Sequence, residues 1–166
     1  MTPVRLAILL AALLSAAPSF AFDNEPSGFR GVDWGTPLGA VRGKVKLVFN
    51  RAIEADIAEY RSQADLRVAG VPLLFNFYRF YRGRLSEGIM FTDFSQRANL
   101  EQVLTARFGT PQDKAGRQVV WAGKTTIVVL TCGSWEKACS ATFQSVALAE
   151  EVSKNRAATA KSSKDF

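Results

Sequence analysis

The sequence predicts an α+β fold, in which an antiparallel sheet of about six to eight strands carries two helices packed on one face. Short runs of β-branched or alternating residues, separated by glycine-containing turns, recur along the chain and are typical of antiparallel hairpins. Helix-start signals occur twice, near residue 36 and near residue 99. Since strands follow each helix, the order is compatible with two helix-plus-meander halves that join near residue 95.

Residues 1–21 have the pattern of a cleavable secretory signal peptide. Arg5 supplies the positive start, residues 6–17 form an uncharged and largely apolar run of 12 residues, and small side chains precede a cleavage point after Ala21. A helix that spans a bilayer needs about 20 apolar residues, so this run is too short to remain as an anchor. We therefore expect a periplasmic or secreted mature chain with no transmembrane segment.

Three segments are expected after cleavage. Residues 22–28 form a short linker, residues 29–149 form one α+β domain, and residues 150–166 form a polar, flexible tail rich in Lys, Ser and Ala. Removing the leader takes away one basic residue, which leaves 20 basic and 15 acidic residues and a net charge of +5. This excess favours weak attraction to anionic surfaces and does not specify a partner.

The first half of the domain opens with a short, weak helix. Thr36 can cap its orphan N–H groups, and Pro37 suits its first position. Residues 44–49 alternate basic and apolar side chains, as an edge strand does. Residues 51–62 are ambiguous, because apolar side chains at helical spacing overlap with a stretch that is equally compatible with an extended conformation.

The clearest hairpin in the sequence joins strands at 71–81 and 85–94 through a turn around Gly83. The clearest helix follows it, with a cap at Asn99 or one turn earlier, and Gly109 ends it. Its apolar face is formed by side chains at i, i+3, i+4 and i+8: Leu100, Val103, Leu104 and Phe108. This is the best-supported helix of the chain.

The two cysteines of the chain, Cys132 and Cys139, indicate a disulfide. They separate an apolar run at 124–131, which we expect to pair with 118–122, from an alternating run at 140–148. The spacing predicts a hairpin closed by a disulfide that contributes about 2–3 kcal/mol to stability. A redox-active pair usually has the C-x-x-C spacing, and a metal site needs further ligands, so we favour the structural role.

The chain contains no histidine. This excludes Ser-His-Asp and Cys-His nucleophile pairs, histidine-ligated zinc, and imidazole acid–base chemistry near neutral pH. Carboxylate chemistry, a Ser–Lys pair or a thiol would remain for an enzyme. Since no such set is readable in the sequence, we assign no catalytic, cofactor-binding or metal-binding residue and expect a protein that is not an enzyme.

Three motifs carry a resemblance to known proteins: Phe29-x-Gly-x-x-Trp-Gly-Thr-Pro37, Phe80-Tyr-x-Gly-x-Leu85, and Leu100-x-x-x-Leu104-x-x-x-Phe-Gly109 followed by Trp121. Over roughly 29–148 the chain resembles small exported bacterial proteins, periplasmic or secreted, of uncharacterised function. Because the motifs consist of turn glycines, helix caps and core aromatics, the resemblance implies a compartment and a fold but no activity. In element order alone, the chain is similar to the helix-on-sheet modules of β-lactamase-inhibitor-type proteins and small outer-membrane-assembly lipoproteins.

Two places are candidates for contact with a partner. Trp135 lies between the two cysteines, where a large aromatic on a disulfide-closed loop would suit an anchor role. Its alternative is packing over the disulfide or the sheet. Residues 75–84 interleave aromatic side chains with arginines, and the candidate contacts there are Tyr78, Arg79, Phe80 and Arg82. The favoured interpretation of that strand is core packing in the middle of the sheet, and the alternative is a solvent-facing strip that binds an anionic or aromatic ligand.

These observations favour an exported protein that acts by protein–protein contact, with another envelope protein or a cell-wall component as partner. Export argues against nucleic acid as a partner. The alternative function is a carrier or sensor of a small anionic or aromatic ligand, or of a cell-wall fragment. A carboxylate-dependent hydrolase ranks third, because it requires two acids that converge in one cleft.

Overall fold

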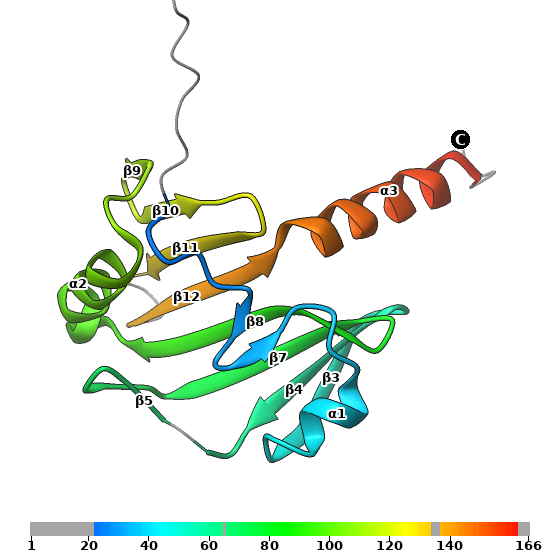
Figure 1. Cartoon of the computed structure of the whole chain (residues 1–166), viewed down its shortest axis with the longest axis horizontal. Coiled ribbons are helices and arrows are strands. Elements are labelled where there is room, and N and C mark those ends of the chain that lie inside the picture. The colour runs from blue at the N-terminus through cyan, green and yellow to red at the C-terminus, as the bar shows by residue number, and fades with distance from the viewer. Residues whose placement is uncertain (1–21, 65, 134–136, 163–166) are drawn as a thin grey trace, which may run out of the picture.

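The computed structural model describes residues 22–64, 66–133 and 137–162 of the chain (Figure 1). Its main element is an antiparallel sheet of eight strands in the order β3-β4-β7-β8-β12-β11-β10-β9. In chain order these strands are β3 (Leu47–Glu54), β4 (Ile57–Ser62), β7 (Phe75–Tyr81), β8 (Arg84–Asp93), β9 (Asp113–Ala115), β10 (Gln118–Ala122), β11 (Thr126–Gly133) and β12 (Ala138–Ser145). The predicted α+β fold with an antiparallel sheet is therefore confirmed.

Short elements complete the architecture. Two small hairpins lie outside the large sheet: β1 (Gly28–Phe29) with β2 (Val32–Asp33), and β5 (Arg67–Val68) with β6 (Val71–Pro72). The helices are α1 (Leu38–Arg42), the 3-10 turn η1 (Phe94–Gln96), α2 (Arg97–Phe108) and α3 (Val146–Ser162). Within the described ranges, no helix is long and apolar enough to cross a membrane.

The strand order divides the sheet into two similar halves. Helix α1 precedes the meander β3-β4-β7-β8, and helix α2 precedes the meander β9-β10-β11-β12. The last strands of the two halves, β8 and β12, pair with each other at the centre of the sheet. This is the arrangement of two helix-plus-meander halves with which the sequence order is compatible.

Both α1 and α2 pack on the same face of the sheet, which we call the core face. Leu100, Leu104 and Phe108 of α2 belong to the same buried cluster as Trp121 of β10. Val41 of α1 is buried and belongs to the same cluster. At roughly 1.5–3 kcal/mol for each large apolar side chain, this burial is the main stabilising contribution to the domain.

The segment predicted as a linker packs against the domain, which corrects that prediction. The ring of Phe22 lies 5.1 Å from that of Phe108, at the end of α2. The carboxylate of Glu25 accepts hydrogen bonds from the backbone N–H groups of Thr125 and Thr126 at the start of β11. Composition alone did not reveal these contacts, because their partners lie about a hundred positions away in the sequence.

The ambiguous segment at 51–62 is extended, not helical. It contributes the end of β3 and all of β4, and β4 pairs with β7 along its whole length. Strand β3 is an edge of the sheet, as the alternation at 44–49 predicts, and its pairing with β4 is interrupted by two register shifts. The pairing of β4 with β7 therefore determines that this segment is extended, since the spacing of its apolar side chains alone leaves its conformation ambiguous.

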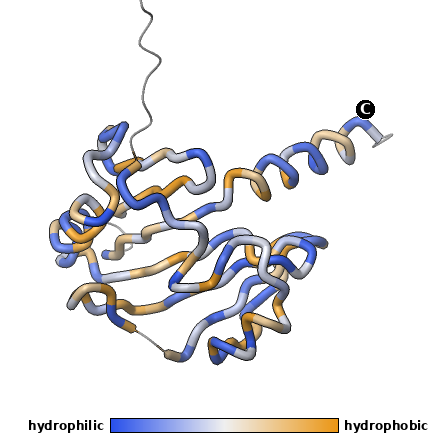
Figure 2. The backbone as a smooth tube through the Cα atoms, viewed as in Figure 1, coloured by the Kyte–Doolittle hydropathy of each residue, from blue (hydrophilic) through white to orange (hydrophobic). Residues whose placement is uncertain are grey.

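The flexible tail predicted from residue 150 is wrong for most of its length, because α3 continues through Ser162. Strand β12 stops at Ser145, whose side chain accepts a hydrogen bond from the N–H of Leu148 in the first turn of the helix. Leu148 itself is buried. Apolar and polar stretches alternate along α3 in Figure 2, while in Figure 1 its far end projects from the body of the protein. The first turn of α3 is therefore held by the packing of Leu148.

The disulfide is confirmed: Cys132 and Cys139 are bonded and lie directly opposite each other in the β11–β12 pair. Both side chains point to the core face and are buried, with 2% and 1% of their surface exposed. The bond therefore fixes the register of the last hairpin from inside the core.

Candidate functional site

The second face of the sheet carries no side chain of α1 or α2, and we call its central part the open face. Two rows of paired residues cross it. One row is Arg61, Phe77, Ile89, Thr142, Val129 and Val120, and the other is Phe75, Phe91, Ser140, Thr131 and Gln118. Along β11 and β12 these residues alternate strictly with buried ones, which shows that they share the face opposite the core.

The open face is apolar and partly exposed. Phe75 has 36% of its surface exposed, Phe77 and Phe91 are half-buried, and among the paired rows only Ile89 is buried. A sheet face covered by helices shows a different pattern, as the fully buried Leu130 and Ala141 on the core face illustrate. The half-buried side chains indicate that, among the elements the structure describes, none packs over this part of the face.

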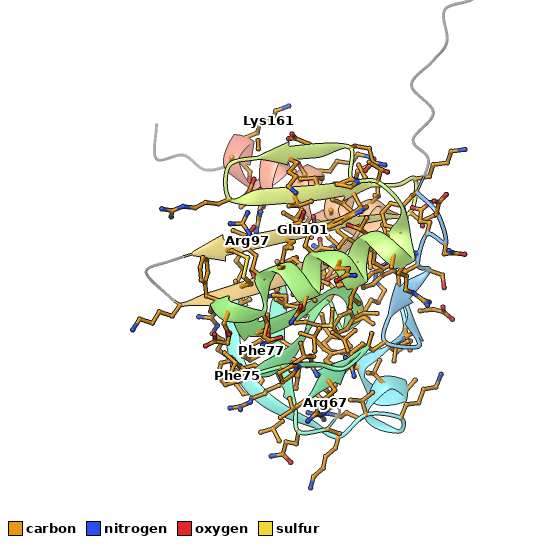
Figure 3. The ribbon with its side chains drawn as sticks, turned by 90° about the vertical axis from the view of Figure 1, so that its left-hand side faces the viewer. Arg67, Phe75, Phe77, Arg97, Glu101 and Lys161 are labelled. Atoms are coloured by element: carbon orange, nitrogen blue, oxygen red, sulfur yellow. A yellow bond between two sulfur atoms is a disulfide. The ribbon has the colours of Figure 1, made fainter. Side chains whose placement is uncertain are left out.

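Three phenylalanine rings form a cluster at one end of the open face. The ring centres of Phe75 and Phe77 lie 6.1 Å apart, those of Phe75 and Phe91 6.3 Å, and those of Phe77 and Phe91 5.8 Å. Figure 3 shows Phe75 and Phe77 next to each other. The guanidinium of Arg61 lies 4.6 Å from the centre of the Phe75 ring, a cation–π distance. The cluster thus combines exposed aromatic surface with a positive charge.

A charged network lies beside the aromatic cluster on the same face. Arg79 Nε donates to Glu59 at 2.8 Å, and Arg79 Nη1 donates to both carboxylate oxygens of Glu87 at 3.1 Å. Glu59 also accepts hydrogen bonds from Asn50 and Arg51, at 2.7 and 3.1 Å. The guanidinium of Arg79 therefore lies between two carboxylates and is not available to a partner.

The two carboxylates of this network have opposite pKa shifts. Burial alone would raise the pKa of Glu59, but the hydrogen bonds from Arg79 and Asn50 outweigh it and hold the pKa below its ordinary value. For Glu87 burial dominates and raises the pKa, since the attraction of Arg79 offsets it only in part. A pair of glycosidase carboxylates flanks space for a substrate, whereas here both acids bind one guanidinium.

Helix α3 covers the end of the open face beyond this network. Leu148, Ala149 and Val152 of α3 line a small cavity of about 230 Å³ together with Ile57 and Glu87 of the sheet. The helix therefore leaves the phenylalanine cluster uncovered and shields only the opposite end. Among the residues that the structure describes, no group of His, Cys, Asp or Glu side chains is arranged to hold a metal ion.

The structure separates the residues that the sequence singles out as partner contacts. Tyr78 and Phe80 are buried on the core face, with 2% and 1% of their surface exposed, so they are not contacts. Strand β7 is central, and its alternate residues must point into the helical layer.

Arg79 lies on the opposite face but is held by the two carboxylates, and Arg82 is exposed in the turn before β8, where it pairs with Asp56 at 3.0 Å. Trp135 lies outside the described residues.

Sequence reasoning missed Phe91 and Arg61 as members of the surface cluster. Phe91 lies in the alternating segment 85–94, but alternation alone does not give its neighbours. Only the register of this strand against 75–81 shows that Phe91 pairs with Phe75. Arg61 lies in the segment that the sequence leaves ambiguous, so its face could not be assigned without the β4–β7 pairing. Comparisons of this chain with protein-family models, curated protein sequences and solved structures gave no match.

Proposed function

We propose that this chain is an exported protein that binds another envelope protein through the open face of its sheet. The observation that carries the proposal is the cluster of Phe75, Phe77 and Phe91 with Arg61 on a sheet face that α1 and α2 leave uncovered. Aromatic side chains and arginine are the residues most enriched in the energetic centres of protein interfaces. Rigid strands hold them, so little conformational entropy is lost when a partner binds.

The charges around the cluster favour a partner with acidic side chains. Arg61 is exposed, and the side chain of Arg51 is 63% exposed although it pairs with Glu59. The chain without its leader has a net charge of +5. We therefore propose an apolar segment flanked by acidic residues as the matching surface, because complementary charges speed association and fix its register.

The leader pattern at 1–21 and the disulfide support an oxidising compartment outside the cytoplasm. In that compartment the bonded hairpin is stable, and the sheet that carries the open face keeps its register. Of the two functions that the sequence favours, protein contact is better supported here, because the exposed aromatics lie on a broad sheet face and not in a pocket.

Site-specific photo-crosslinking tests this proposal in cells that make the full chain. We would place p-benzoylphenylalanine at position 77 or 142 on the open face, and at position 106 on the exposed side of α2 as a control. We expect a discrete protein adduct from 77 and 142 but not from 106, and a lower adduct yield when Arg61→Glu is added. Equal adducts from all three positions, or none from 77 and 142, would contradict the proposal.

A further inference from the structure

The two edges of the large sheet differ in length. Strand β9 at one edge has three residues, whereas β3 at the other has eight. Leu47 of β3 is half-buried, and the other seven residues of the strand are exposed. Within the described ranges β4 is the one strand that pairs with β3, and no loop or helix bonds to the backbone of its other side. A long edge of this kind is a template on which a further strand can pair.

Exposed apolar side chains are concentrated on this edge. Of the six large apolar side chains that are exposed in the described part of the chain, three belong to β3: Val48, Phe49 and Ile53. Val48 is 45% exposed and pairs with Arg61, so it lies on the open face. Phe49 is 55% exposed and pairs with the core residue Tyr60, so it lies on the other face. A strand added at this edge would therefore find an apolar neighbour on each face.

The pairing of β3 with β4 is regular only in its first part. Residues 47–49 pair in succession, and register shifts follow between Phe49 and Arg51 and between Ala52 and Glu54. Bulges of this kind twist an edge strand and hinder further pairing. The part of the edge that suits a further strand is therefore the run at 47–49, which is long enough for one short segment.

The charges beside this run are positive. Lys44 and Lys46 precede it, both are exposed, and neither forms an ion pair with a residue that the structure describes. Arg51 follows the run, and its side chain is 63% exposed although it forms one ion pair. Glu54 is the one acidic residue of β3, and it is bound by Arg156 of α3. The edge is therefore complementary to a segment that carries acidic side chains.

Two other occupants fit this edge less well. A second copy of the chain would bring a second set of the same cations to the edge, and lysines at an edge are a common device against such self-pairing. A membrane surface would attract the cations and the apolar side chains, but it offers no strand to pair with the backbone of the edge. An acidic peptide strand satisfies the charges and the backbone together.

We infer that β3 binds a short, extended segment of another protein as an added strand, and that this segment has apolar residues at its centre and acidic residues on both sides. The apolar residues contact Val48 and Phe49, and the acidic ones lie beside Lys46 and Arg51. Backbone hydrogen bonds supply affinity in this mode of recognition, and the side chains supply specificity. The inference goes beyond the proposed function, because it concerns the edge of the sheet and not the open face.

Amide hydrogen exchange, measured by NMR on the purified, oxidised protein, tests the inference. The probe is a peptide with blocked ends, in which a run of valines is flanked by glutamates. We expect saturable binding and slower exchange in β3, with unchanged exchange in β9 at the other edge. The same peptide with every amide N-methylated should not bind, because it has no N–H group to donate. The peptide with lysine in place of glutamate should bind at least about tenfold more weakly.

Lys46→Glu should weaken binding of the glutamate peptide about three- to tenfold, because an attraction becomes a repulsion at an exposed position. The matched control is Lys161→Glu, which makes the same change at an exposed position near the end of α3. The control should leave the affinity unchanged, and both variants should unfold at the temperature of the parent protein.

Absence of peptide binding, equal binding of the N-methylated peptide, an equal loss in both variants, or slower exchange in β9 in place of β3 would each overturn the inference. Self-association of the protein through β3, or binding to vesicles of anionic phospholipid in place of the peptide, would overturn it as well. Since the probe is a synthetic peptide and the signal comes from β3, the outcome is separate from that of the crosslinking experiment at positions 77 and 142.

Discussion

The ring of Phe29 lies directly over Gly88, so that a Cβ atom added at this glycine would overlap the ring. Phe29 belongs to the first small hairpin and Gly88 to the middle of β8, at the centre of the large sheet. The aromatic ring fills the space that a side chain would otherwise occupy, and it also packs against Tyr78 and Phe143. The first hairpin is therefore docked on the sheet by one ring over one glycine.

Gly88→Ala should destabilise the domain by about 1–3 kcal/mol, because the new methyl group forces the ring of Phe29 out of its place. Gly39→Ala is the matched control: Gly39 lies in α1, and nothing stands within 4 Å of the added Cβ. The control should be neutral or stabilising by about 0.5–1 kcal/mol, as alanine favours a helix over glycine. Urea unfolding measures both, and equal midpoints would contradict the role of Gly88.

Arg79→Met should destabilise the domain by about 3–5 kcal/mol, because it leaves the buried Glu59 without its main cation. Arg82→Met removes the same charge from an exposed pair with Asp56 and should cost less than about 1 kcal/mol. Free energies of unfolding at neutral pH distinguish the two. If both variants lost the same small amount, the network around Arg79 would have to be regarded as an ordinary surface pair.

The pH dependence of stability should reflect the opposite pKa shifts of Glu59 and Glu87. The folded pKa of Glu59 lies below its ordinary value near 4.5, so its contribution is present above that pH and is lost as the pH falls through the folded pKa. The folded pKa of Glu87 is raised, so its contribution is present at low pH and is lost as the pH rises through the folded pKa. The two carboxylates therefore make stability depend on pH in opposite directions.

Glu59→Gln should therefore flatten the loss of stability as the pH falls below about 4.5, and Glu87→Gln should abolish the loss of stability that Glu87 causes as the pH rises above about 4.5. Chemical denaturation at a series of pH values on both sides of 4.5 gives the slopes. Identical slopes in the parent chain and both variants would show that neither carboxylate has a folded pKa that differs from its unfolded one. Slopes that change in the same direction would contradict the assignment of opposite shifts.

The sequence predicts the sheet and α2 well, because alternation and helix caps are local signals. It does not predict α3: the alternating run at 140–148 extends past the true end of β12, and Ser145, which caps the helix, looks like one more strand residue. Nor could it place Tyr78 and Phe80, since alternation says that they share a face but not which face the helices cover. That choice is made by α2 and Phe29, whose contacts are distant in sequence.

The open face was beyond sequence reasoning for the same reason. The open face requires the register of β4, β7 and β8, which sets Arg61 beside Phe75 and Phe91. The residue types were visible in the sequence, but their spatial neighbours were not.

Removal of the disulfide should lower stability by about 2–3 kcal/mol, as expected for a short closed loop. The variant that carries both Cys132→Ala and Cys139→Ala tests this in thermal unfolding. Because both sulfurs are buried, a reductant should act on the native parent chain only slowly and should act much faster in mild denaturant. Rapid reduction of the native chain would contradict the placement of both cysteines on the core face.

Leu148→Ala should detach the start of α3 from the sheet and cost about 2–5 kcal/mol, because the side chain is 6% exposed and packs beside the end of the open face. Lys154→Ala is the control on the same helix, since its side chain is 80% exposed, and it should change stability by less than about 0.5 kcal/mol. Amide hydrogen exchange should show faster exchange throughout α3 in the first variant only.

If α3 exchanged equally fast in the parent chain, the helix would form without docking, and the pairing of Arg84 with Glu151 at 2.7 Å would have to be transient. Slow exchange in the parent chain that is lost in Leu148→Ala would instead establish that α3 is held on the sheet by this one buried side chain, which leaves the phenylalanine cluster as the part of that face open to a partner.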